Sequence, residues 1–253
     1  MPHPLDGARL KLHRARAHVH TVDREVAAYL GTQPVQVEDR QERDGNRRHI
    51  QWVATSAHEP PPELGVIVGE WAHNVRGALD YTVYELVRRE TGEDDPRWTQ
   101  FPIVVEEPRY ADQERQRLRG APDWALPVFR GLQPFNDGED APWHPLAILG
   151  DISNRDKHRL VHTAAMQIAG SQARVSGTSM MAIHRLAQNP GTVDGERVIL
   201  DAVLDTDGDD FQIELNVQVS VALEQYEIPI VPLLEGITYE ADSIVEWFSP
   251  ALD

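Results

Sequence analysis

The sequence predicts an α+β protein, in which a helical N-terminal part with a β-hairpin precedes a C-terminal antiparallel sheet and a final helix. Two observations lead to this prediction. Apolar residues recur at alternating spacings of three and four within 5–30 and 60–90, which is typical of amphipathic helices. Beyond residue 162, β-branched segments are separated by turn sequences at 189–191 and 207–208, and no helix alternates with them.

The first predicted element is a helix over 5–30 that ends at Gly31. Its apolar seam consists of Leu12, Ala15, Val19, Val22, Val26 and Tyr29. The seam is long enough for an antiparallel helix partner or a dimer contact. We expect a second chain to cover one of its flanks, so the seam also predicts self-association as a homodimer. Two alternating segments then flank Asp44-Gly45-Asn46, which predicts a β-hairpin at about 34–55.

Two more helices are predicted before residue 163. Pro60-Pro61-Pro62 opens the second helix, which continues to about Glu90. The stretch 93–142 is rich in proline and reads as loop, with short helical pieces around 111–118 and 124–131. A third helix is predicted over 145–162.

The remainder predicts four or five antiparallel strands and a last helix from near Gly236 through Trp247. The chain therefore divides into a mostly helical part, 1–162, and an acidic β-sheet part with a C-terminal helix, 163–253. The alternative is that both parts form one continuous domain.

Composition excludes several classes of protein. The chain has no cysteine, so disulfides, thiol nucleophiles and cysteine zinc sites are excluded. It has neither an apolar run of the roughly 20 residues that span a bilayer nor an apolar signal segment, which predicts a cytoplasmic protein without membrane association. The net charge is −17, and 163–253 holds 15 acidic residues against three arginines, so any contact with nucleic acid would have to use 1–162.

The second and third predicted helices each carry polar residues in columns away from the apolar stripe. The column on the second helix contains His73, Arg76, Asp80 and Tyr84. The third helix carries two columns, one with Asp151, Asn154 and His158 and one with Arg155 and His162. We hypothesise that these columns share a polar pocket, with the binding residues His73, Asn74, Asp80, Asp151, Asn154 and Lys157. The alternative is two ordinary solvated faces with hydrogen bonds between residues four apart.

These residues also carry a resemblance to known sequences. The stretch GEWAHNVRGALDYTVYEL, followed by FPI, HPLAILGDISN and NRDKHR, resembles a widespread group of uncharacterised bacterial proteins. Members of that group have an HN-x-R-x-ALD helix, an FPI segment and an N-x-DKHR helix. The resemblance covers about 60–165.

A weaker likeness is to HEPN ribonucleases, which are helical domains with an R-x(4–6)-H motif that Arg155-Asp156 and His162 fit. This likeness implies a toxin or defence enzyme that cleaves RNA without a metal, at a site assembled in a dimer interface. The implied catalytic residues are Arg155 and His162, or Arg76 and His158. Arginine would stabilise the negative charge of the phosphorane that forms during cleavage, and histidine would transfer protons as acid or base.

The second hypothesis is a non-catalytic interaction or small-ligand-binding module, in which the His, Asn, Arg and Asp side chains form a structural polar network. No cofactor is predicted, and no metal site is predicted either. His158 and His162 stand one turn apart, but Arg159 occupies the position of the glutamate in zincins. The sequence identifies neither the ligand nor whether the protein is an enzyme.

Overall fold

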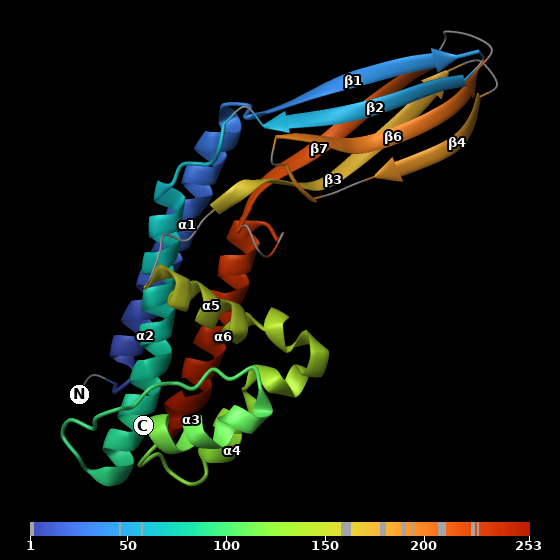
Figure 1. Cartoon of the computed structure of the whole chain (residues 1–253). Coiled ribbons are helices and arrows are strands. Elements are labelled where there is room, and N and C mark those ends of the chain that lie inside the picture. The colour runs from blue at the N-terminus through green and yellow to red at the C-terminus, as the bar shows by residue number, and fades with distance from the viewer. Residues whose placement is uncertain are drawn as a thin grey trace. The chain divides into compact units, whose positions relative to one another are not determined.

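The computed structural model of the 253-residue chain confirms the α+β class (Figure 1). It describes residues 3–45, 47–56, 58–157, 163–177, 181–188, 191–193, 195–206, 211–223, 226 and 228–253. The chain forms two compact units, each assembled from separate stretches. The helical unit comprises Met1–Val22, Gly65–Val161 and Val231–Asp253, and the β unit comprises Asp23–Leu64 and His162–Ile230.

One junction between these units falls next to residue 162, where the sequence predicted a division. The hairpin and the final helix, however, are each in the unit opposite to the predicted one. The hairpin belongs to the β unit, because its second strand pairs with a strand of the C-terminal region. The final helix belongs to the helical unit. Both placements result from contacts between residues far apart in the sequence.

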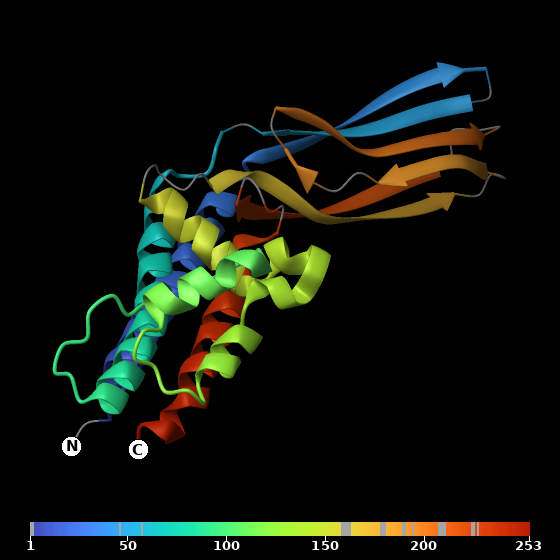
Figure 2. The ribbon, with the colours of Figure 1, turned by 60° about the horizontal axis from the view of Figure 1, so that its bottom comes forward.

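Three long helices run side by side in the helical unit (Figure 1 and Figure 2). They are α1 (Asp6–Gly31), α2 (Glu63–Thr91) and α6 (Ile230–Phe248), and the first two match their predicted ranges closely. Helix α6 begins earlier than the predicted Gly236. Its Pro232 stands in the first turn, where a missing N–H costs no helical hydrogen bond, and Leu233 and Leu234 are buried.

The apolar seam of α1 is buried within the single chain. Its six residues, from Leu12 to Tyr29, are at most 6% exposed. The chain therefore covers the seam by itself, while self-association as a homodimer stays a prediction. His18 on the same helix is also buried, which the sequence analysis did not anticipate, and its Nδ1 lies 3.6 Å from Glu70 of α2.

Short helices connect α2 to the third predicted helix. They are η1 (Glu107–Arg109), α3 (Tyr110–Arg117), α4 (Leu126–Gly131) and η2 (Pro134–Trp143), so the two predicted pieces are confirmed. Their aromatic side chains anchor them: Phe129 of α4 stacks on Phe248 of α6 with ring centroids 4.8 Å apart. Among the described residues, no helix is long and apolar enough to cross a lipid bilayer.

Helix α5 (Pro145–Asp156) is shorter than the predicted 145–162. Its start has a clear local cause, because Pro145 occupies the first turn and the Nδ1 of His144 accepts a hydrogen bond from the N–H of Leu146 at 3.1 Å. Its last turn offers only polar side chains for packing, and the chain enters a strand at Thr163. Residues 158–162, with His158 and His162, lie outside the described part of the chain.

The β unit contains two antiparallel sheets where the sequence predicted one. The first has the order β1-β2-β6-β4 and the second the order β5-β3-β7 (Figure 1). The predicted hairpin is confirmed as β1 (Val35–Asp44) and β2 (Arg47–Ser56), with Gly45 in the left-handed region at φ 61°. The other strands are β3 (Thr163–Gly177), β4 (Met181–Gln188), β5 (Gly191–Thr192), β6 (Glu196–Thr206) and β7 (Phe211–Leu223).

A buried hydrogen bond joins α2 to α6 and provides a test of this packing. The indole N–H of Trp71 donates to Oγ1 of Thr238 at 2.9 Å, and both side chains are buried. We expect Thr238→Val to lower the free energy of unfolding by about 1–3 kcal/mol, because it leaves the indole N–H without an acceptor. Urea denaturation measures this loss.

Ser243→Ala is the control on the same helix, since it removes an exposed hydroxyl that bonds only the backbone of its own helix. Equal stability of the two variants would contradict this account of α2 and α6.

Candidate functional site

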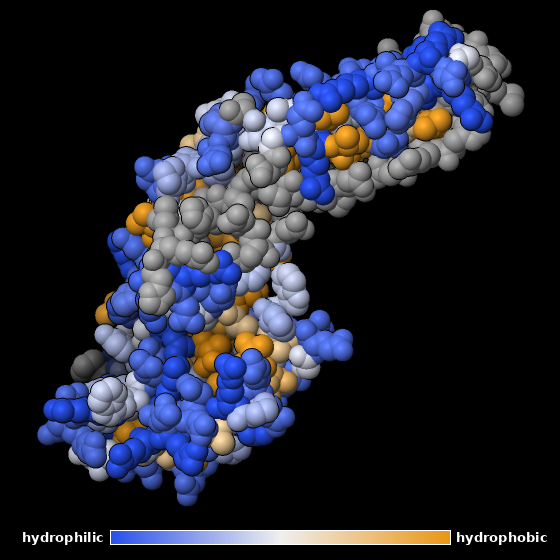
Figure 3. Space-filling model, in the orientation of Figure 1, coloured by the Kyte–Doolittle hydropathy of each residue, from blue (hydrophilic) through white to orange (hydrophobic). Residues whose placement is uncertain are grey.

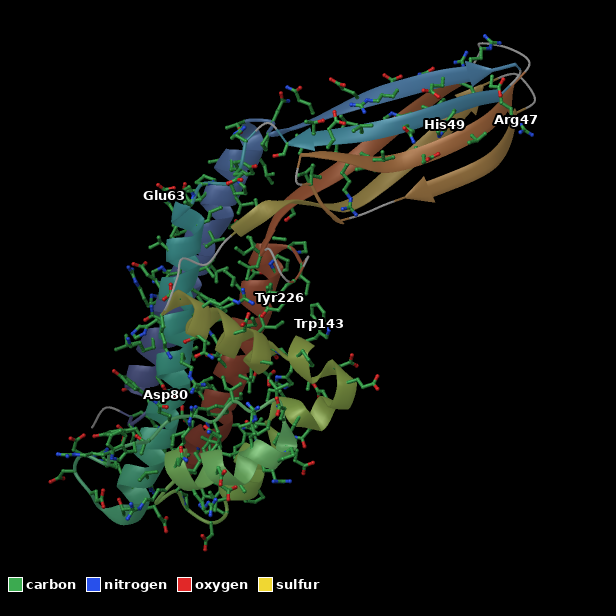
Figure 4. All side chains as sticks on the ribbon, viewed as in Figure 1. Arg47, His49, Glu63, Asp80, Trp143 and Tyr226 are labelled. Atoms are coloured by element: carbon green, nitrogen blue, oxygen red, sulfur yellow. The ribbon has the colours of Figure 1, made fainter. Side chains whose placement is uncertain are left out.

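The polar columns of α2 and α5 line one cavity of about 510 Å³ in the helical unit. Helix α2 contributes His73, Arg76, Gly77 and Asp80, and α5 with its C-cap contributes Ala147, Gly150, Asp151, Ser153, Asn154 and Lys157. The remaining wall consists of Gln100, Ile103, Val105 and Arg117. Figure 4 labels Asp80 on α2, and hydrophilic residues cover much of the helical unit on the face that Figure 3 shows.

Helix α5 approaches α2 closely at the end of the cavity. The carboxylate of Asp156 lies so near the backbone of Gly69 that a Cβ atom at position 69 would collide with it. A larger residue at position 69 would therefore require the Asp156 carboxylate to move.

The cavity wall opposite α5 is held by a clamp between Arg76, Asp80 and the main chain of Phe101. Nη2 of Arg76 donates to the carbonyl oxygen of Phe101 at 2.5 Å, and the N–H of Phe101 donates to Oδ1 of Asp80 at 2.8 Å. The two side chains are one helical turn apart, with Nη2 and Oδ1 separated by 3.5 Å. The buried ring of Phe101 meets Phe129 edge-on, so the segment is fixed on both sides.

Arg76 also carries a polar atom that the clamp does not satisfy. Its side chain is 16% exposed, and Nη1 is buried with no hydrogen-bond partner among the residues that the structure describes. A buried guanidinium N–H without an acceptor is unfavourable, and such groups concentrate at functional sites. The clamp therefore leaves one N–H group of the guanidinium unpaired, in a side chain that lines the cavity.

The charges around the cavity are predominantly positive. Arg117 and Lys157 both stabilise the carboxylate of Asp80, while Arg117 repels Arg76. The second carboxylate, Asp151, is neutralised by Arg155, whose Nε lies 2.8 Å from its Oδ2. The positive charges of Arg76, Arg117 and Lys157 thus exceed the single negative charge of Asp80.

Burial dominates the titration of both clamp residues. It raises the pKa of Asp80 above its ordinary value, against the opposing effects of Arg76, the N–H of Phe101, Arg117 and Lys157. Burial likewise lowers the pKa of Arg76, but a guanidinium remains protonated at neutral pH. The cavity therefore keeps its arginine charge, whereas its central carboxyl is the group that is more easily neutralised.

The structure brings together most of the residues that the sequence analysis singled out. His73, Arg76, Asp80, Asp151, Asn154 and Lys157 all line the cavity. Two others point elsewhere: Asn74 donates to the carbonyl oxygen of Glu70, and Arg155 is engaged by Asp151. His158 and His162 fall outside the described residues.

The sequence analysis missed Gln100, Arg117 and the main chain of Phe101, because it treated 93–142 as connecting loop. The FPI segment, Phe101-Pro102-Ile103, was the available signal, since it belongs to the motif set that resembles known sequences. Its contribution is made by the backbone of Phe101 and by Ile103 in the wall.

Comparison with protein-family models, curated proteins and solved structures finds no match to this chain. Within the described part of the chain, no group of three or more histidine, aspartate or glutamate side chains is placed to hold a metal ion.

The clamp makes a specific demand on stability. We expect Asp80→Ala to lower the free energy of unfolding by about 2–3 kcal/mol, because it removes the acceptor for the N–H of Phe101 and the partner of a mostly buried arginine. Asp80→Asn keeps an acceptor oxygen and should lose less. Urea denaturation at neutral pH measures both losses.

Asp112→Ala is the control, since Asp112 pairs with Arg115 at the surface, where such pairs contribute about 0–1 kcal/mol. If Asp80→Ala costs no more than this control, the clamp does not hold the cavity wall.

Proposed function

We propose that this protein binds a small anionic molecule, one that carries a phosphate, sulfate or carboxylate group, in the cavity between α2 and α5. The observation that carries the proposal is the convergence of Arg76, Arg117 and Lys157 on one cavity, where Nη1 of Arg76 has no acceptor among the described residues. An oxyanion bound among these cations relieves the repulsion between Arg76 and Arg117.

A ligand site explains the cavity better than a sealed structural network does. A network that only fixes helix packing would satisfy its buried donors internally, whereas Nη1 of Arg76 has no partner within the described part of the chain. The side chains of Asn154 and Lys157 are exposed, so the site is open to solvent. Its volume falls within the range of roughly 300–1,000 Å³ that small-molecule pockets occupy.

The ribonuclease hypothesis has weaker support from the described residues. Arg155, which the HEPN likeness makes the phosphate-binding arginine, is held by Asp151 in an ion pair and does not line the cavity. The net charge of −17 also opposes binding of a polyanion. Among the described residues, the histidine that lines the cavity together with Arg76, Arg117 and Lys157 is His73 of α2.

Anion titration tests the proposal. We expect inorganic sulfate and phosphate to bind saturably and to raise the melting temperature at constant ionic strength. Arg117→Gln and Lys157→Gln should each weaken binding about tenfold, because each removes a charge-assisted contact. Isothermal titration calorimetry gives the affinities.

Arg115→Gln is the matched control on α3, since Arg115 is exposed and does not line the cavity. Absence of saturable binding, or an equal effect of the control, would overturn the proposal. Cleavage of RNA by the wild-type protein, lost in His158→Ala and His162→Ala, would support the ribonuclease hypothesis in its place.

Asp80 makes anion binding depend on pH. Its ionised carboxylate repels an anion and its protonated form does not, and burial raises its pKa. Sulfate affinity should therefore increase severalfold as the pH falls from 7 through the pKa of Asp80, since sulfate itself keeps its charge. Calorimetry in a His73→Gln background removes the contribution of the imidazole.

Asp80→Asn in the same background should flatten this dependence. The sign of the stability effect follows from the same shift: a raised carboxyl pKa makes the folded state bind the proton more tightly, so Asp80 favours folding in acid and less so as the pH rises. A pH dependence that persists in Asp80→Asn would show that another group controls binding.

A further inference from the structure

We infer that the ligand of this cavity is a nucleoside monophosphate, whose phosphate group binds among Arg76, Arg117 and Lys157 and whose base stacks on Trp98. This inference rests on the proposed anion-binding function and adds the chemical class of the ligand.

The cavity is much larger than its anion-binding part requires. A single phosphate group occupies a small fraction of about 510 Å³, so the ligand carries further atoms. Gln100, Ser153 and Asn154 are among the other residues that line it. Amide and hydroxyl side chains both donate and accept hydrogen bonds, which suits the hydroxyl groups of a sugar.

Trp98 is the most exposed large hydrophobic side chain among the described residues, at 84%. Its backbone lies in the left-handed region at φ 69°, which is uncommon for a residue other than glycine. Strained positions of this kind persist where the surroundings hold them, and they cluster at ligand sites.

The chain on both sides of Trp98 is held in place. The hydroxyl of Tyr84 donates to the carbonyl oxygen of Asp94 at 3.1 Å, and Pro96 is buried. On the other side, the N–H of Gln100 donates to the carbonyl oxygen of Arg117 at 3.2 Å. The indole is therefore presented to solvent from a fixed segment.

Trp98 is close to the cavity wall along the chain. Gln100 lines the cavity and follows Trp98 by two residues, so their Cα atoms are at most about 7 Å apart. An indole within this reach offers a flat, apolar surface beside a cationic pocket. Such a surface stacks on planar rings. In a ligand that also carries a sugar and a phosphate, that ring is a nucleobase.

A free nucleotide fits the charge of the protein better than RNA does. The net charge of −17 repels a polyanion along its length, whereas one phosphate group meets the local excess of three cations over one carboxylate. The cavity volume likewise suits a single nucleotide.

Calorimetric titrations with AMP, ribose 5-phosphate and inorganic phosphate test the inference on the full-length protein. AMP should bind at least about fivefold more tightly than ribose 5-phosphate, since base stacking on an aromatic side chain accounts for a factor of this size or more. Trp98→Ala should remove that advantage without changing the affinity for ribose 5-phosphate. Trp98→Tyr should restore most of it.

Tyr239→Ala is the control, because Tyr239 is a 74% exposed aromatic residue of α6 that does not line the cavity. Equal affinities for AMP and ribose 5-phosphate, or an unchanged affinity for AMP in Trp98→Ala, would overturn the inference and leave the proposed function intact. Failure of all three probes to bind would overturn both. Tighter binding of a short single-stranded RNA than of AMP would overturn the assignment to a free nucleotide.

Discussion

The geometry of the cavity depends on the clamp that Arg76 and Asp80 form on the main chain of Phe101. Two side chains one helical turn apart engage the C=O and the N–H of a single residue, so the segment cannot shift along α2 without breaking two charge-assisted hydrogen bonds. The ring of Phe101 continues this anchor into the core through Phe129, which stacks on Phe248 of α6. A wall made of irregular chain thereby acquires the rigidity of the helices behind it.

Burial of Arg76 in this clamp has a cost in stability. Removing a guanidinium from water is unfavourable, and one carboxylate at 3.5 Å with one carbonyl does not compensate it fully. A packed apolar pair would hold two elements together at lower cost. Retention of the charge is understandable if the guanidinium has a second task, which is to attract an anion together with Arg117 and Lys157.

The position of α5 is the other constraint on the site. Its N-terminus is defined locally by His144 and Pro145, and near its C-terminus the carboxylate of Asp156 lies against the backbone of Gly69 of α2. The helix therefore delivers Asn154 and Lys157 to the cavity, while Arg155 turns to Asp151 within its own helix. Neighbouring polar residues on α5 thus have different roles.

The sequence by itself determined the elements with strong local signals. The helical periodicity of α1 and α2, the hairpin around Gly45 and the polar columns of α2 and α5 are all patterns within short stretches of chain, and a column on a helix is a matter of spacing alone. The columns also sufficed to select five residues that line the cavity, namely His73, Arg76, Asp80, Asp151 and Asn154.

Only the tertiary structure decided which groups meet. The pairing of β2 with β6, the return of α6 to the helical unit and the entry of Gln100 and Arg117 into the cavity all join residues distant in sequence. The clamp binds a backbone N–H and C=O, which every residue except proline possesses, so it leaves no mark in residue type. Packing in three dimensions decides which distant residues pair and which main-chain groups a side chain binds. The periodicity of a sequence predicts neither.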